Sequence, residues 1–210
     1  MENFNLILPE IFLSVSIFIT LLIGVFFKNS YNLVTNLTYV IIVSLLLIIF
    51  NSFNESGNLF GNSFVSNSFI NFFKILILLG TLFVMLITQN FIKEMKINHF
   101  EYPLLLLFSV LGMFFMISSN DLMSFYLGLE LQSLALYILA SLDRDNLKSN
   151  ESGIKYFILS ALSSGLLLYG CSLLYGFTGS TNFEEINLKM ELDNTGTIFA
   201  MVFILVGLGF

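Results

Sequence analysis

The chain has 210 residues, of which 57% are hydrophobic and only 10% are charged, and its formal net charge is -6. Soluble domains carry nearer a quarter of charged residues, so this composition excludes a water-soluble fold. The eight cationic residues are scattered singly and form no basic patch, which together with the acidic balance excludes a nucleic-acid partner.

The sequence lacks the groups that would hold a cofactor or a metal. Cys171 is the only cysteine and His99 the only histidine, so neither an iron-sulfur cluster nor a histidine-based triad can be assembled. No glycine-rich phosphate loop follows a strand pattern. We therefore expect no cofactor and no metal in this chain, and no site for NADH binding or hydride transfer.

Uncharged apolar segments are long enough to cross about 30 Å of hydrocarbon, which takes roughly 20 helical residues. Because these segments are continuously apolar rather than alternating, a membrane β-barrel is excluded, and the predicted fold class is all-α, a polytopic transmembrane helical bundle. The predicted spans are Leu8–Phe27, Leu33–Phe50, Phe72–Phe91, Tyr102–Ser118, Leu122–Leu142 and Ile154–Phe177, with a seventh that begins near Thr197. Two longer polar connections, expected to be solvated loops, are Asn51–Asn71 and Thr178–Asn194.

Small side chains recur four residues apart in the sixth predicted span, a spacing typical of helices that approach a neighbour closely. The pairs are Ser160 with Ser164 and Ala161 with Gly165. We expect this face to pack against another helix.

The cationic residues in the connections predict the orientation, because cytoplasmic loops carry an excess of lysine and arginine. The first, third and fifth loops hold Lys28, Lys93, Lys96, Arg144 and Lys148. On the other side we count only Lys74, assigned to the second loop, and Lys189 in the acidic sixth loop. This five-to-two bias places the N-terminus outside and the Arg144 loop on the cytoplasmic or matrix side.

Glu130 lies near the middle of the fifth span, where an acidic side chain costs roughly 2.5 to 3.5 kcal/mol on insertion scales. Such a group must face protein or water rather than lipid. Gln132, Ser133 and Tyr137 are near it in sequence and could share a hydrated pocket. The alternative is a structural carboxyl group, protonated or hydrogen-bonded. In contrast, Asp121 sits in the tight turn before this span, where capping of the next helix explains it.

Lys155 lies just inside the sixth span. If the turn is Asp143–Asn146, Glu130 is level with Leu159, and Lys155 is one helical turn or about 6 Å away along the axis, within reach of a lysine stem. Burial favours the neutral form of a carboxyl group and a nearby ammonium favours the ionised form, so a movable lysine would switch its proton affinity. The alternative is that Lys155 extends to the inner surface beside Glu151, one turn earlier.

A central motif carries a resemblance to a known family. It runs from Ser119-Asn120-Asp121-Leu122 through Leu127-Gly128-Leu129-Glu130-Leu131-Gln132-Ser133 to Leu136-Tyr137, followed by Glu151-Ser152-Gly153-Ile154-Lys155-Tyr156-Phe157. This segment closely resembles the antiporter-like membrane subunits of respiratory NADH:ubiquinone oxidoreductase, complex I, and is most similar in detail to chain 2. The similarity is strong over 102–176 and resumes at 207–210, while the first three spans match mainly in hydropathy.

The resemblance implies proposed proton-transfer roles for Glu130 and Lys155, which match the family's fifth-helix glutamate and sixth-helix lysine. It also implies three leading helices in 1–100 and the first four helices of an inverted repeat in 101–210, the last incomplete. The expected partners are other membrane-arm subunits, the lipid bilayer, and a second chain or continuation that supplies the remaining helices. NADH, flavin, iron-sulfur clusters and ubiquinone are expected in other subunits of the assembly.

The function that follows is a proton-translocating, non-redox subunit of that enzyme. Two alternatives stay open: a subunit of a multisubunit sodium/proton antiporter, and a non-pumping structural membrane subunit. Lysine outnumbers arginine seven to one and Phe, Ile and Asn are abundant, as AT-rich organelle codons would produce. We therefore expect the mitochondrial inner membrane, with a bacterial plasma membrane as the alternative.

Overall fold

The computed structural model describes residues 4–27, 30–94, 99–190 and 194–209. The helices within these ranges are α1 (Leu8–Phe26), α2 (Tyr31–Asn51), α3 (Ser68–Glu94), α4 (Glu101–Ser118), α5 (Leu122–Ala140), α6 (Leu147–Thr178), α7 (Phe183–Lys189) and α8 (Thr195–Gly209). A single 3-10 turn, Phe4–Ile7, precedes α1. Six of these helices, α1 to α6, are long and apolar enough to cross a membrane, and α8 is a shorter apolar helix. The chain is a multi-pass helical membrane protein, as predicted.

The polar connections contain more structure than expected. Within the predicted loop Asn51–Asn71, β1 (Gly57–Leu59) and β2 (Phe64–Ser66) form an antiparallel hairpin. Three consecutive residues at its tip, Phe60 to Asn62, have positive φ, which closes the turn. The loop Thr178–Asn194 contains α7.

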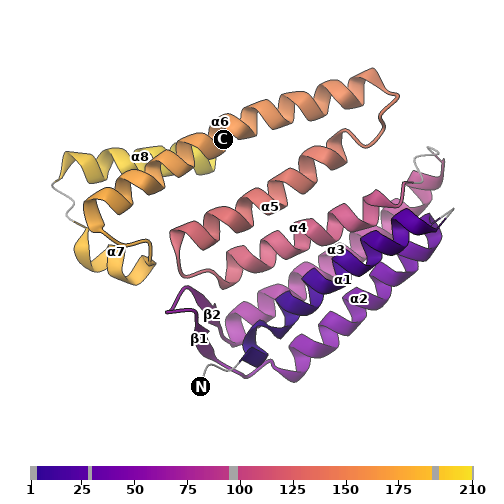
Figure 1. Cartoon of the computed structure of the whole chain (residues 1–210), viewed down its shortest axis with the longest axis horizontal. Helices are drawn as coiled ribbons and strands as arrows, with labels where there is room; N and C mark the ends of the chain where they lie inside the picture. The colour runs from indigo at the N-terminus through magenta and orange to yellow at the C-terminus, as the bar shows by residue number, and fades with distance from the viewer. Residues whose placement is uncertain (1–3, 28–29, 95–98, 191–193, 210) are drawn as a thin grey trace.

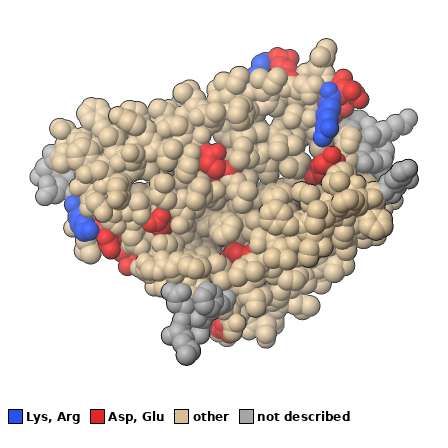
Figure 2. All heavy atoms as spheres, viewed as in Figure 1, with Lys and Arg blue, Asp and Glu red and all other residues tan. Residues whose placement is uncertain are grey.

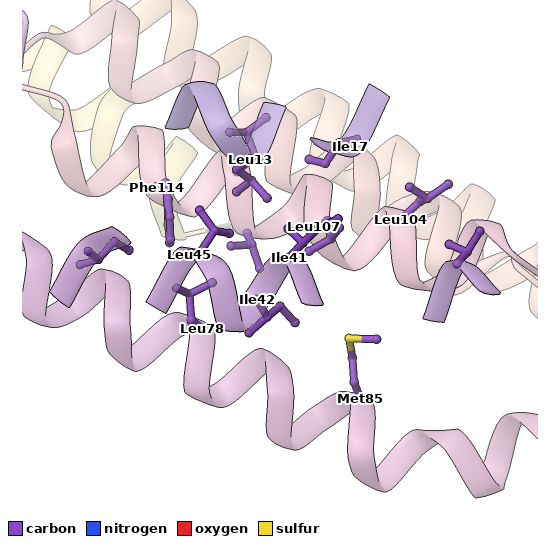
Figure 3. Close-up of a cluster of buried hydrophobic side chains, with 14 residues drawn as sticks. Leu13, Ile17, Ile41, Ile42, Leu45, Leu78, Met85, Leu104, Leu107 and Phe114 are labelled. Carbon is purple, nitrogen blue, oxygen red and sulfur yellow. The ribbon is translucent and has the colours of Figure 1, made fainter. Parts of the chain in front are cut away.

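The helices form two groups, α1 to α4 and α5 to α8, which contact each other where α4 packs against α5 (Figure 1). Helices α1, α2, α3 and α4 enclose one apolar cluster, shown in Figure 3, in which Leu13, Ile42, Leu78 and Leu107 are fully buried. Helices α5, α6, α7 and α8 share a smaller cluster around Leu167. Because α4 packs on α1, α2, α3 and α5, it fixes α5 relative to the first group.

Glycines bring α4 and α5 together backbone to backbone. A Cβ atom added at Gly112 would lie 2.6 Å from the Gln132 nitrogen, and one at Gly128 would lie 2.8 Å from the Met116 nitrogen. Such positions admit glycine alone without displacement of a helix.

The small-residue face predicted on α6 is only partly a packing face. At Gly165 no atom of the described residues lies within 4 Å of an added Cβ, whereas at Gly170 an added Cβ would lie 2.8 Å from Ile204 on α8. Ser163 donates a 2.6 Å hydrogen bond to the Gly207 carbonyl on α8. The close contact of α6 with α8 is therefore made by the face that carries Ser163 and Gly170, and not by the predicted face with Ala161 and Gly165.

The bundle has two structurally distinct ends. The hairpin end holds β1 and β2, the first turns of α1, α3 and α5, and the last turns of α4 and α6. The Arg144 end holds the connection between α5 and α6, where Arg144 lies 3.6 Å from the Glu101 carboxylate at the start of α4. Lys28 and Lys96, counted in the orientation argument, lie outside the described residues.

Candidate functional site

Glu130 is partly buried near the middle of α5, on the side turned away from α4. Gly128 packs on α4, and a residue two positions later points about 200° away around the helix. The same helical geometry puts Tyr126, Glu130 and Tyr137 on one face. The Oε1 atom of Glu130 is buried and accepts no hydrogen bond from the described residues.

Hydroxyl groups from α5 and α6 meet on this face. Tyr137 is hydrogen-bonded to Ser160, and Tyr126 has the side chains of Glu130 and Ser164 as polar neighbours. We call these five residues, Tyr126, Glu130, Tyr137, Ser160 and Ser164, the α5–α6 polar seam. They form a line of titratable and hydroxyl groups inside an otherwise apolar bundle.

The predicted pocket around Glu130 is only partly as expected. Tyr137 belongs to the polar seam, but Ser133 donates a 2.7 Å bond to the Leu129 carbonyl of its own helix. The backbone of Gln132 faces Gly112 on α4. The Glu130 carboxyl group therefore keeps an unused acceptor oxygen.

Lys155 does not pair with Glu130. It forms a 2.5 Å ion pair with Glu151 on the same helix, and these side chains are 70% and 62% exposed. Because Ser141 packs closely against Gly153, Glu130 is level with about Ser164, which puts Lys155 about nine residues or roughly 14 Å away along the axis.

The expected level failed because α6 does not begin beside the end of α5. Ser149 and Ser152, in the first turns of α6, both donate hydrogen bonds to the Ala140 carbonyl. These turns satisfy the free carbonyl at the α5 C-terminus, so α6 starts beyond α5 rather than level with it.

A pocket of about 520 Å³ opens between α5 and α6 on the Arg144 side. Tyr137, Ser141 and Asn150 supply its polar lining, and Ile138, Gly153, Ile154 and Phe157 complete it. Since Tyr137 also belongs to the polar seam, the pocket reaches the seam at a point seven residues, or roughly 10 Å, from Glu130.

Lys74 and Glu10 form a buried ion pair that was not predicted from the sequence. Lys74 was counted in a loop, but α3 begins at Ser68, so Lys74 lies in its second turn and is fully buried. Its Nζ atom is 2.5 Å from Oε1 of Glu10, which is 1% exposed in the first turn of α1. The available signal was Asn67, whose side chain accepts a 2.8 Å bond from the Ile70 nitrogen and caps α3.

Lys74 therefore leaves the loop count. Lys93, in the last turn of α3, and Lys148, in the first turn of α6, still lie at the Arg144 end, so the predicted orientation keeps its direction. Figure 2 shows the cationic side chains near two ends of the visible face, while the surface between them consists of uncharged residues with a few acidic side chains. This distribution is typical of a protein whose middle lies in lipid.

Comparison with known proteins gives the family likeness. Residues 119–210 match the model of the NADH:quinone oxidoreductase/Mrp antiporter transmembrane family. The subunit N of NADH-quinone oxidoreductase from Pelagibacter ubique is 56% identical over 211 aligned residues, which cover 100% of this chain and 45% of that protein. The resemblance to the antiporter-like subunits is confirmed.

Other relatives agree. Subunit N from Bartonella bacilliformis is 49% identical over 98% of this chain and 42% of its own length. A chain in the structure of respiratory complex I from Thermus thermophilus with bound aureothin superposes with a TM-score of 0.78 and 27% identity, over 96% of this chain and 43% of that chain. This chain thus spans less than half the length of the antiporter-like relatives that it matches.

Proposed function

We propose that this chain is part of a proton-translocating membrane subunit of a respiratory NADH:quinone oxidoreductase. The observation that carries the proposal is Glu130, a carboxyl group at mid-membrane depth whose buried oxygen has no partner among the described residues. An intramembrane ionisable residue is costly and typically marks an ion or proton pathway.

The polar seam supplies a path to this group. A proton entering the pocket on the Arg144 side meets the hydroxyl groups of Tyr137 and Ser160, and water is required for the remaining rise to Glu130. Glu130 would hold the proton as a neutral carboxyl group. Tyr126, its polar neighbour toward the hairpin end, would receive it next, with Ser164 as a further hydroxyl neighbour of Tyr126.

Lys155 is proposed to act at the entrance and not as a direct partner of Glu130. Lys155 and Glu151 are two exposed charged groups on α6, close in sequence to Ile154 and Phe157, which line the pocket. A role in delivering protons to the pocket fits this position.

The remaining assignments follow from the same proposal. This chain would act as a non-redox subunit, with NADH, flavin, iron-sulfur clusters and ubiquinone bound by other subunits of the assembly. Since the similar subunits quoted above are bacterial, a bacterial plasma membrane is favoured over the mitochondrial inner membrane. Their oxidoreductase names also favour this function over a sodium/proton antiporter, and co-purification of flavin and iron-sulfur chains would distinguish the two.

The central test is Glu130→Gln in the full-length subunit of the assembled complex. The amide keeps the shape of the side chain and removes its titration, so NADH-driven proton uptake into vesicles should fall roughly tenfold or more. Glu185→Gln is the matched control, because this exposed carboxylate pairs with Lys189 on α7, away from the polar seam and the pocket. If the Glu130→Gln complex assembled fully and moved the unmodified number of protons per NADH, Glu130 would not carry protons and its role would be structural.

A further inference from the structure

The Glu10–Lys74 pair lies far from the polar seam, near the hairpin end of the α1–α4 group. Glu10 belongs to the first turn of α1, Lys74 to the second turn of α3, and Ser118 is the last residue of α4. Three helices therefore converge on the pair. Neither charge reaches the surface, since the exposed fractions are 1% for Glu10 and 0% for Lys74.

Aromatic rings close the site. The Lys74 ammonium lies 5.4 Å from the centre of the Phe64 ring on β2 and 5.8 Å from the centre of the Phe114 ring on α4. Both rings are buried, and a cation at this distance from an aromatic ring is stabilised by it. The hairpin thus covers the pair on the side of the membrane surface.

The hydrogen-bonding capacity of the pair is only partly used. Oε2 of Glu10 has no partner among the described residues, and Nζ of Lys74 makes a close ion pair without an aligned hydrogen bond. Oε1 of Glu10 accepts a 3.4 Å bond from the Ser118 hydroxyl. A carboxylate and an ammonium with free positions, next to a hydroxyl group, provide the polar partners that a buried water needs.

Holding two helices together does not require charges here. Removing each ion from water costs several kcal/mol, and well-packed apolar residues in place of a buried pair are often neutral or stabilising. A buried pair that is also under-bonded is therefore better suited to changing its protonation than to stabilising the fold.

We propose that Glu10 and Lys74 form a second proton-binding site, in which Glu10 takes up and releases a proton beneath the hairpin. When a proton arrives, the carboxylate becomes a neutral carboxyl group and the ion pair opens. When the proton leaves, the pair closes again. Among the described residues, the charged group that contacts Glu10 is Lys74 from α3, while α4 and β2 contribute the uncharged Ser118, Phe114 and Phe64.

The test uses the unmodified assembled complex and an apolar carbodiimide, and it does not depend on pumping. The reagent adds a protonated carboxyl group across one C=N bond, with the carboxyl oxygen joining carbon and the proton moving to nitrogen. Peptide mass spectrometry should show modification of Glu10, with a yield that falls about tenfold for each pH unit above the midpoint. The exposed Glu55, in the loop at the same end, is the internal control.

Two variants separate proton binding from a structural role. Lys74→Met removes the ammonium, so modification of Glu10 should persist to higher pH. The double variant Glu10→Leu with Lys74→Met should assemble, because its apolar side chains replace the pair, and it should lose the modified peptide. A Glu10 that stays unmodified at every pH in the unmodified complex would overturn the proposal, and pumping by the Glu130→Gln complex has no bearing on that result.

Discussion

Three kinds of charged residue occur on the membrane helices. Lys155 and Glu151 form an exposed pair, and exposed pairs of this spacing contribute only about 0.3–0.5 kcal/mol. Glu10 and Lys74 form a buried pair, in which loss of one partner leaves an uncompensated charge. Glu130 has a buried oxygen with no partner among the described residues. The buried groups are the ones that we propose to bind protons.

We predict that Lys155→Met reduces NADH-driven proton uptake less than Glu130→Gln does. The reason is position, since Lys155 pairs with Glu151 at the Arg144 side and lies roughly 14 Å from the level of Glu130. Lys189→Met is the matched control, because Lys189 forms an equivalent exposed pair with Glu185 at the opposite end. Equal losses for Lys155→Met and Glu130→Gln would show that the lysine acts within the path itself.

At the scale of elements, α5 is fixed at its start and along its length. Asp121 caps it, as predicted, by accepting bonds of 2.8 and 3.1 Å from the nitrogens of Met123 and Ser124, and it also accepts a bond from Thr181. Farther along, the close contact at Gly112 and Gly128 holds α5 against α4. Both contacts set which way Glu130 points.

Substitution at the closest helix contact should therefore destabilise the subunit. Gly112→Ala places a Cβ atom 2.6 Å from the Gln132 nitrogen and 2.7 Å from the Gly128 oxygen, neither of which can move without shifting a helix. We expect a cost of about 1–3 kcal/mol, measured as a lower thermal midpoint of the purified complex. Gly80→Ala is the control, because nothing described lies within 4 Å of its added Cβ. Equal midpoints for the two variants would contradict the packing argument.

At the scale of the whole molecule, the two ends differ in charge and in architecture. The Arg144 end holds the connection between α5 and α6 with its cationic Arg144, while β1, β2 and the acidic helix α7 lie toward the hairpin end. Asn62 at the hairpin tip donates a 3.1 Å bond to Glu184 of α7, which joins the first helical group to the second. This hydrogen bond connects the two helical groups at the end that we place outside.

The orientation can be measured by cysteine labelling in intact cells. With Cys171 replaced, we expect an impermeant thiol reagent added outside to modify Glu185→Cys and to spare Asp145→Cys, because the cationic loops stay inside. Both positions are exposed, so the comparison reports sidedness and not burial. The reverse labelling pattern would mean that the chain is inverted in the membrane.

The sequence by itself determined the helical class, the six spans and the Asp121 cap. In lipid each backbone must satisfy its own hydrogen bonds, so apolar length alone specifies a spanning helix. The cap depends on neighbours two and three residues away, which local sequence also specifies. Glu130 could also be identified from local sequence, since placing a carboxyl group in the middle of a membrane span costs free energy whichever neighbour it faces.

Tertiary structure decided which charges meet. The Glu10–Lys74 pair depends on the register of α1 against α3, two helices separated by α2 and a hairpin, and no local pattern encodes that register. The distance between Glu130 and Lys155 likewise depends on Ser149 and Ser152 folding over the end of α5. Partners across helices are set by packing of whole elements, because a side chain reaches only the groups that its helix places at the same level.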